Sequence, residues 1–260
     1  MHHASEILPP STLIAILAAG KSTRMKSPLP KVLHTLHGNP LLRYVVDAAR
    51  EANGAPPLVV VNPENASAIE RIFQHEIRTV VQTESHGTGH AVQSIPPSIF
   101  GAASHLVVLY GDHPLLTGAT VRRLIESHST AHTPVTIMTV VVPHFCDEYA
   151  VFQAFGRVVR THEGTLDRIV EYKDANDQQK KITEVNPGYY CFSIPWLLSH
   201  LSLLTNNNAQ KEFYLTDLIG IARGEYDAVA VVPIDDPLEG MGVNTPEEFA
   251  IAERAMARRV

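Results

Sequence analysis

Cysteine is scarce in this chain of 260 residues, since Cys146 and Cys191 are the only two and they lie far apart. Neither stands in a run with the spacing of a cysteine metal site. A chain of this length can build a sizeable hydrophobic core without a disulfide scaffold, and two distant cysteines suit a reducing compartment. The sequence therefore excludes the small disulfide-rich secreted class and favours the cytosol.

Positive charge is also scarce. The chain has 21 Lys and Arg residues but 27 Asp and Glu residues, which gives a formal net charge of −6. The surface as a whole should repel nucleic acid and anionic membranes, so an anionic ligand needs a local cluster of cations. The apolar run Leu13–Ala19 is too short to span a bilayer, and no basic stretch precedes it. We expect a soluble cytoplasmic protein that has neither nucleic acid nor a membrane as its partner.

Internal repeats and low-complexity tracts are absent too, and the composition is that of an ordinary globular protein, with 45% hydrophobic residues. Short apolar runs alternate with helical stretches up to Val142. The expected strands cover 13–18, 58–61, 79–82, 106–110 and 135–142, and the expected helices cover 40–53, 64–75 and 117–129. This alternation predicts an α/β fold, a Rossmann-like, mostly parallel sheet flanked by helices, with ligands at the carboxyl ends of the strands.

After Val142 the pattern becomes β-rich. Two short runs at 157–160 and 168–172 flank His162-Glu163-Gly164, which predicts a hairpin. A final helix should begin at Pro246, with Thr245 as its N-cap. Further elements are expected at 189–192, 195–204, 215–223 and 228–232. We expect a polar tail over 1–11, one domain over 12–245 with an inserted β-rich substrate lobe at roughly 143–215, and a C-terminal helix over 246–260.

The segment from Leu17 to Leu33, LAAGKSTRMKSPLPKVL, carries the most chemical information. The first strand ends there in small residues, so backbone amides can approach a ligand without obstruction by side chains. Amides and fixed cations stabilise the transition state of transfer from a nucleoside triphosphate, because charge spreads over the oxygens of the attacked phosphorus. A solvated surface loop is the alternative interpretation. The turn consists of Leu17, Ala18, Ala19 and Gly20, and the cations that follow are Lys21, Arg24, Lys26 and Lys31.

Gly20-Lys21-Ser22 also matches the end of a Walker A phosphate-binding loop. Such a loop requires a glycine five residues before Gly20, and this sequence has Ala15 there, inside the expected strand. We therefore reject the P-loop interpretation.

Gln82 begins the polar segment QTESHGTGHAVQ, directly after an expected strand. Its amide can both donate and accept, so it could pair with the edge of a pyrimidine. Gly87 gives backbone access to a ligand, and Thr88 can cap the helix expected to start there. His86 and His90 have a zinc-like spacing, but the intervening glycines argue against a regular helix and hence against a metal site.

Asp112 stands just past the end of the buried run Leu106–Tyr110. A carboxylate at the carboxyl end of a parallel strand can hold Mg²⁺ in the ligand crevice. Magnesium takes one or two protein oxygens and completes its shell with water and phosphate. An aspartate that only caps a turn or a helix is the alternative interpretation.

These segments resemble the signatures of the sugar-nucleotide pyrophosphorylases, in particular the uridyltransferase domain of the bacterial N-acetylglucosamine-1-phosphate uridyltransferases. The turn is similar to L-A-A-G-x-G-T-R-M-x-S-x-x-P-K-V-L, the segment after it to Q-x-E-x-x-G-T-G-H-A and the strand end to Y-G-D-x-P-L. The resemblance implies that the turn amides hold the phosphates and that Arg24 and Lys31 carry catalytic charge. It also implies that Gln82, Gly87 and Thr88 contact uracil.

Later segments are similar to the same family, and the resemblance extends over roughly residues 13–255. Asn244 matches the asparagine of G-V-N, which implies a second magnesium ligand beside Asp112. Matches to Y-G-R-I, I-V-E-x-K-D-A and E-I-N-T-G imply that Gly156, Glu171 and Asn186 contact the sugar. The segment 206–217 resembles N-N-N-A-Q-G-E-Y-Y-I-T-D, the most family-specific stretch, which we interpret as structural support beside the site.

The sequence departs from the family in three places. Ser22 stands where the commonest form has glycine, and Phe155 stands where tyrosine is expected, at the end of an altered segment over 147–155. Bifunctional members continue into an acetyltransferase domain, which this sequence does not contain. We therefore expect uridylyl transfer without acetyl transfer, and a monomer or weak oligomer.

The sequence and the resemblance together predict a magnesium-dependent enzyme of amino-sugar metabolism that joins UTP to N-acetylglucosamine 1-phosphate. The products would be UDP-N-acetylglucosamine, a cell wall precursor, and pyrophosphate. Two alternatives remain open: the same reaction with another sugar 1-phosphate or nucleotide, and a catalytically silent sugar-nucleotide sensor. The prediction requires that Lys31, Asp112 and Asn244 surround a single cavity.

Overall fold

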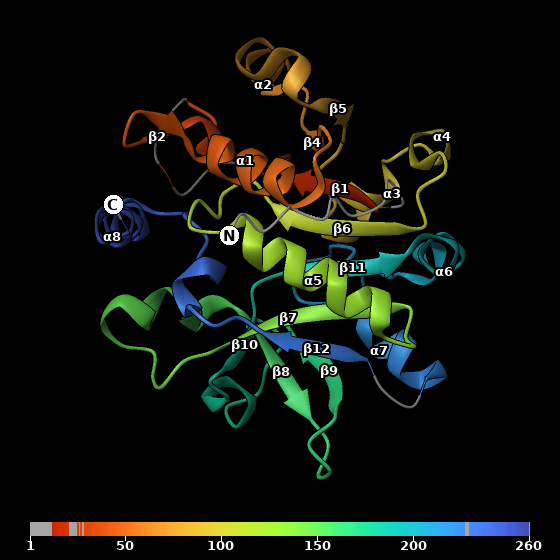
Figure 1. The fold of residues 1–260 in the computed structure, drawn as a ribbon. Helices are drawn as coiled ribbons and strands as arrows, with labels where there is room; N and C mark the ends of the chain where they lie inside the picture. Colours follow the sequence, from red (N-terminus) through yellow and green to blue (C-terminus); the bar gives the residue numbers. More distant parts are fainter. Residues whose placement is uncertain (1–11, 21–24, 26, 28, 227–228, 260) are drawn as a thin grey trace, which may run out of the picture.

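The computed structural model of the protein describes residues 12–20, 25, 27, 29–226 and 229–259. Helices cover both faces of one mixed, ten-stranded sheet (Figure 1). The strand order is β5-β4-β1-β6-β11-β7-β10-β8-β9, and β12 pairs with β7 off this path. The strands are β1 (Thr12–Leu17), β4 (Leu58–Val61), β5 (Arg78–Val81), β6 (His105–Tyr110), β7 (Val135–Val141), β8 (Gly156–Arg160), β9 (Leu166–Val170), β10 (Glu184–Asn186), β11 (Tyr190–Ser193) and β12 (Ala230–Pro233). A separate hairpin pairs β2 (Thr35–Leu36) with β3 (Asn39–Pro40).

The sheet has a parallel half and a mixed half. β5, β4, β1 and β6 are parallel neighbours, so their carboxyl ends lie along one edge. β11 runs antiparallel between β6 and β7, and β12 is parallel to β7. β10, β8 and β9 then continue the sheet as antiparallel strands. This confirms the predicted fold class, a mostly parallel sheet with a β-rich lobe.

Two hydrophobic layers enclose the sheet. In β1, Ile14 and Ile16 pack in the layer that includes α1 and α5, whereas Leu13, Ala15 and Leu17 pack in the layer that includes α3, α6 and α7. All of β1 is buried, as expected for a central parallel strand with both faces covered. The helices are α1 (Leu41–Asn53), α2 (Ala66–Phe73), α3 (Thr88–Gln93), α4 (Pro97–Phe100), α5 (Gly118–Thr130), α6 (Ile194–His200), α7 (Asp217–Glu225) and α8 (Pro246–Ala257).

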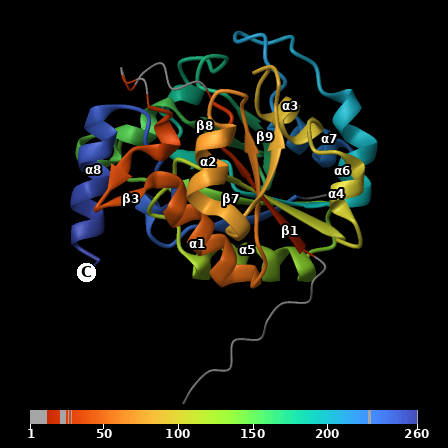
Figure 2. The same cartoon turned by 90° about the horizontal axis from the view of Figure 1, so that it is seen from above.

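The last helix, α8, stands beside the β2–β3 hairpin (Figure 2). His37 Nε2, in the turn of that hairpin, lies 3.3 Å from the carbonyl oxygen of Glu253 in α8. Among the described residues, no helix combines the length and the apolar character that a membrane crossing requires.

Most of the elements predicted from the sequence occur, and the exceptions have local causes. β4 has the predicted bounds, and the β8–β9 hairpin forms where it was predicted. The helix predicted over 64–75 ends earlier, because Gln74 has a φ of 46° and closes α2 into a short 3₁₀ turn. The strands β2, β3 and β10 were not predicted, since two or three residues are too few for a hydrophobic period to show.

Candidate active site

A cavity of about 970 Å³ opens at the carboxyl ends of β1, β5 and β6. Every predicted site residue that the structure describes lines it, whereas the predicted catalytic Arg24 lies outside the described residues. The lining includes the predicted phosphate turn (Leu17, Ala18, Ala19, Gly20), the predicted base contacts (Gln82, Gly87, Thr88), the predicted sugar contacts (Gly156, Glu171, Asn186), and Lys31, Asp112 and Asn244. Residues from segments that span more than two hundred positions therefore line one cavity.

Lys31, Asp112 and Asn244 meet at one side of this cavity, as predicted. The Lys31 Nζ lies 2.5 Å from Asp112 Oδ2 and 2.7 Å from Asn244 Oδ1. A backbone hydrogen bond of 2.9 Å from Val243 N to the carbonyl oxygen of Asp112 fastens the two segments together. The carboxylate and the amide oxygen therefore converge on one cationic nitrogen.

Local structure explains why these three side chains are available to a ligand. Lys31 begins a 3₁₀ turn whose next two residues, Val32 and Leu33, are buried and anchor it. Asn244 precedes α8, and the capping box of that helix is formed by Thr245 and Glu248, as the sequence predicted for the cap. The side chain of Asn244 is therefore not needed as a helix cap.

The electrostatics of the site keep Asp112 ionised. Burial, the largest single influence, would raise the pKa of the Asp112 carboxyl, but the charge of Lys31, the neighbouring His113 and the hydrogen bonds to the carboxylate together lower that pKa below its usual value. Burial lowers the pKa of the neighbouring His113 to about 4, so this imidazole is neutral near pH 7. An ionised carboxylate and an amide oxygen that face one point are oxygen donors of the kind that a hard divalent cation takes.

The predicted base-contacting segment is hydrogen-bonded to residues 213–215. Phe213 N donates to the carbonyl oxygen of His86, and Gly89 N donates to the carbonyl oxygen of Phe213, both at 2.8 Å. Thr88 Oγ1 accepts a hydrogen bond from Leu215 N at 3.1 Å. Two expectations were therefore wrong: the N-cap of α3 is Gly87 and not Thr88, and the helix does continue through Gly89.

His86 and His90 have different partners in the structure. His86 Nε2 lies 2.7 Å from Glu84 Oε2, whereas His90 Nδ1 lies 2.9 Å from Gln82 Nε2. Across the part of the chain that the structure describes, no group of three His, Cys, Asp or Glu side chains could hold a metal ion.

Gly87→Ala should destabilise the fold more than Gly164→Ala. Both glycines have positive φ, 103° and 83°, so alanine is strained at either position by roughly 1–3 kcal/mol. A Cβ on Gly87 would also lie 2.7 Å from Phe213 O, whereas nothing lies within 4 Å at Gly164. Each kcal/mol by which Gly87→Ala is destabilised beyond Gly164→Ala should lower its melting temperature by a further 2–4 °C or so, which calorimetry can measure. Equal melting temperatures would show that the contact with Phe213 is unimportant.

The predicted sugar contacts also line the cavity. Glu171 is half-buried, accepts a hydrogen bond from Thr216 Oγ1 at 3.1 Å, and has a raised pKa, chiefly because removal from water disfavours its charge. Asn186 uses both ends of its amide within the protein, donating to Tyr190 Oη at 2.6 Å and accepting from Gly188 N at 3.1 Å. The roles of these residues as sugar contacts remain predictions.

Glu171→Gln should raise thermal stability near neutral pH. Because burial raises the pKa of Glu171, the folded chain binds its proton more tightly than the unfolded chain does. The free energy of unfolding therefore falls as the pH rises from the ordinary glutamate pKa through the raised pKa of Glu171. Glutamine does not ionise, so the variant does not lose this stability. Melting temperatures at pH 8 and pH 4 test this: the gain should be present at pH 8 and vanish at pH 4.

The matched control for this variant is Glu163→Gln, since Glu163 is exposed in the β8–β9 turn. Its melting temperature should follow the wild type at both pH values. If Glu171 also accepts from a sugar hydroxyl, Glu171→Gln should raise the KM for the sugar phosphate roughly tenfold, because a hydrogen bond to a charged group is lost. A Glu171→Gln protein that is no more stable than wild type at pH 8 contradicts the burial argument.

Several lining residues were not predicted. Gln210 and Glu212 belong to the segment that we interpreted as structural support, yet they line the cavity. Gln210 accepts from Lys173 Nζ at 2.7 Å, which joins two sides of the opening. Tyr110 and His113 also line it, and their rings stack with centroids 5.6 Å apart. Aromatic residues beside a buried strand are usually core residues, so these two could not be predicted as lining residues from the pattern.

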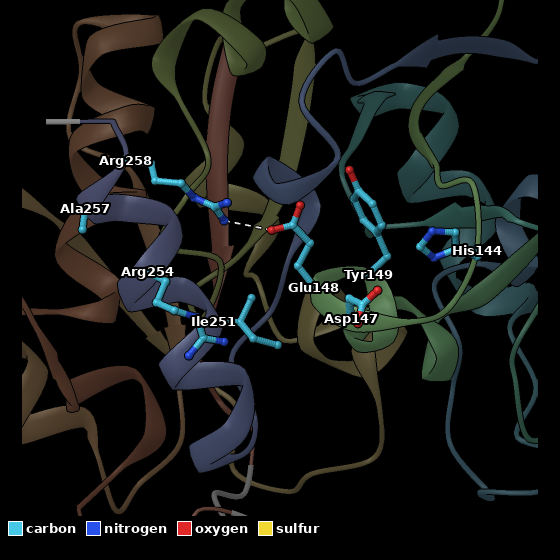
Figure 3. A pocket seen from close by; sticks show the side chains of 8 residues that line it. All are labelled: His144, Asp147, Glu148, Tyr149, Ile251, Arg254, Ala257 and Arg258. Atoms are coloured by element: carbon cyan, nitrogen blue, oxygen red, sulfur yellow. Dashed lines mark hydrogen bonds and ion pairs between the residues drawn. The ribbon is translucent and has the colours of Figure 1, made fainter.

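A second cavity, of about 810 Å³, lies between the 3₁₀ segment Asp147–Ala154 and α8 (Figure 3). Arg258 pairs with Glu148 at 2.8 Å across it. None of the predicted site residues lines this cavity. It marks the place where the altered segment 147–155 rests against α8, whereas the predicted phosphate-binding residues line the first cavity.

A family model of the MobA-like NTP transferase domain matches residues 14–180. The chain belongs to this family. As a MobA-like NTP transferase it is an enzyme, a nucleotidyltransferase, and the cavity at the carboxyl ends of its parallel strands is its candidate active site.

Relatives of this MobA-like NTP transferase carry a more specific name. The bifunctional protein GlmU of Trichlorobacter lovleyi is 44% identical over 247 residues, which are 94% of this chain and 52% of the relative. The bifunctional protein GlmU of Pelobacter propionicus is 41% identical over 249 residues, with the same shares of the two chains. The chain thus spans about half the length of the curated relatives it matches.

A solved structure has the same fold at low sequence identity. The structure of CMP:2-keto-3-deoxy-manno-octonic acid synthetase complexed with CTP superposes with a TM-score of 0.67 and 18% identity. The match covers 96% of this chain and 100% of that one. At this identity the likeness shows the fold alone.

Proposed function

We propose that this MobA-like NTP transferase transfers a uridylyl group from UTP to N-acetylglucosamine 1-phosphate, releases pyrophosphate, and uses magnesium. The observation that carries the proposal is the convergence of Lys31, Asp112 and Asn244 at one side of a single cavity. The rest of the cavity lining offers backbone amides, the buried Gln82 and the half-buried carboxylate of Glu171. The GlmU relatives, matched over 94% of this chain, support the choice of sugar and nucleotide.

In the proposed reaction an oxygen of the sugar 1-phosphate attacks the α-phosphorus of UTP in line. The bond from that phosphorus to the bridging oxygen breaks, pyrophosphate leaves, and no covalent enzyme intermediate forms. The amides of 17–20 hold the triphosphate, and the Lys31 ammonium, with Arg24 from outside the described residues, offsets the charge that develops on the reacting phosphate. Gln82, Gly87 and Thr88 bind the base, while Gly156, Glu171 and Asn186 bind the sugar.

Asp112 and Asn244 are the residues that would hold the magnesium ion. They fit it, because an ionised carboxylate oxygen and an amide oxygen already face one cationic position, the Lys31 Nζ. A divalent cation bound there supplies charge neutralisation to the reacting phosphates.

The test is pyrophosphate release over a matrix of the four nucleoside triphosphates and several sugar 1-phosphates, with and without Mg²⁺. The proposal expects the highest kcat/KM for UTP with N-acetylglucosamine 1-phosphate, and a rate only in the presence of the metal. A preference for another pair would establish the same reaction on other substrates. Binding of a sugar nucleotide without any pyrophosphate release would establish a sensor.

A further inference from the structure

The side chain of Gln82 lies at the wall of the cavity, directly after β5, and is only 4% exposed. Its backbone N–H donates to the carbonyl oxygen of Val61 at 2.8 Å, which fixes where the side chain begins. Its amide nitrogen Nε2 lies 2.9 Å from His90 Nδ1 and 3.3 Å from the carbonyl oxygen of Gly87.

These two contacts determine which way the Gln82 amide faces. A backbone carbonyl oxygen can only accept, so the end of the amide near Gly87 O is the NH₂ group. The second hydrogen of that group points at His90 Nδ1, which accepts, so the His90 ring carries its proton on Nε2. An amide turned by half a rotation would lose the hydrogen bond to Gly87 and set two carbonyl oxygens against each other, and it could contact His90 only if Nδ1 carried the proton.

The same orientation leaves the Gln82 Oε1 for a ligand. Within the described part of the chain, no group donates a hydrogen bond to this oxygen, and it is not among the buried polar atoms without a partner, so it opens to the cavity. A lone acceptor at this wall pairs with an N–H on the edge of a base. Uracil offers such a donor at N3, whereas cytosine has an unprotonated, accepting nitrogen there.

His90 itself is held in place from both sides. It lies in α3, whose start is tied to Phe213 by the hydrogen bond from Gly89 N to Phe213 O. The carbonyl oxygen of His90 accepts from Ser94 N at 2.9 Å, and the rings of His86 and His90 are in edge contact with centroids 5.2 Å apart. The acceptor at Nδ1 therefore has a defined position relative to Gln82.

We propose that His90 is a positioning residue for base selection: its Nδ1 holds the Gln82 amide so that Oε1 faces the cavity, which selects a base with an N3–H over cytosine. This inference rests on the proposed function, because it concerns the nucleotide of that same site. His90 does not line the cavity, and it acts through Gln82 alone.

The experiment compares His90→Phe and His90→Asn with the wild type. Phenylalanine keeps an aromatic ring beside His86 but has no acceptor, whereas the asparagine carbonyl oxygen can take the place of the histidine Nδ1. For His90→Phe we expect kcat/KM for UTP to fall about tenfold through KM, with kcat at saturating UTP within about twofold of wild type. The ratio of kcat/KM for UTP to that for CTP should fall about tenfold. His90→Asn should recover most of that ratio.

The matched control is His86→Phe, since His86 lies on the same segment but contacts Glu84 and does not line the cavity. It should keep the wild-type ratio. Calorimetric titration of each protein with UTP and with CTP, without sugar phosphate, gives the same comparison as a ratio of dissociation constants. The inference would be overturned if His90→Phe kept the wild-type ratio of kcat/KM for UTP to that for CTP. It would also be overturned if both His90 variants lost activity equally and the loss lay in kcat.

Different results would contradict the proposed function and the proposed role of His90. A wild-type protein that releases no pyrophosphate with UTP and any sugar 1-phosphate, or that prefers CTP, contradicts the proposed function. A wild-type protein that prefers UTP, together with a His90→Phe variant that prefers it equally, contradicts only the role of His90.

Discussion

Asp112→Asn is expected to lower kcat/KM for nucleotidyl transfer by about 10³-fold or more while leaving the fold intact. The amide keeps the shape of the side chain but removes the carboxylate charge of Asp112, which pairs with the Lys31 ammonium and lines the cavity. Metal-assisted stabilisation of charge on phosphates amounts to several kcal/mol, and each 1.36 kcal/mol or so corresponds to tenfold in rate. Pyrophosphate release at saturating Mg²⁺ is the measurement.

A variant with the same chemical change elsewhere separates catalysis from general damage. Asp177 is exposed and lies outside the cavity, so Asp177→Asn should keep the wild-type rate within about twofold. Circular dichroism should show a native fold in both variants, because the backbone hydrogen bond from Val243 N to Asp112 O does not involve the side chain. If Asp112→Asn retained a tenth of the wild-type rate at saturating Mg²⁺, Asp112 would not be the metal ligand.

The parts of the site that the sequence predicted are those with a local signature. Asp112 could be placed because it follows a buried strand, and parallel strands bring their carboxyl ends to one edge. Asn244 was predicted from the resemblance to G-V-N, and the capping of α8 by Thr245, the next residue, is consistent with it. In both cases two neighbouring features of the chain agreed, and the structure places both side chains on one cavity.

The parts that the sequence did not predict depend on contacts between distant segments. Thr88 resembled a helix cap, but its hydroxyl accepts from Leu215 N, the N-cap of α3 is Gly87, and Phe213 is hydrogen-bonded to the start of that helix. Propensity describes a residue and its neighbours, so a partner more than a hundred positions away can override it. The orientation of the Gln82 amide belongs to the same class, because it depends on the acceptor at His90.

Lys31→Met should reduce both the rate and the stability of the metal-free protein. The ammonium offsets the charge of Asp112, whose side chain is 11% exposed, and removing one partner of a buried pair costs about 3 kcal/mol. That loss corresponds to a melting temperature roughly 6–12 °C lower. The kcat/KM for transfer should fall by about 10²–10³-fold, the usual cost of losing one charge-stabilising donor.

Added Mg²⁺ should separate two roles of Lys31, the pairing with the Asp112 carboxylate and the stabilisation of charge on the reacting phosphate. In Lys31→Met the carboxylate of Asp112 lacks its internal cation, so added Mg²⁺ should raise the melting temperature of the variant more than that of the wild type. It should not restore the rate, because the ammonium is missing where charge develops on the phosphate. Lys181→Met is the matched control, since Lys181 is exposed and lies outside the cavity, and it should show neither effect. A Lys31→Met protein that Mg²⁺ stabilises no more than wild type would mean that Asp112 and Asn244 do not bind the metal.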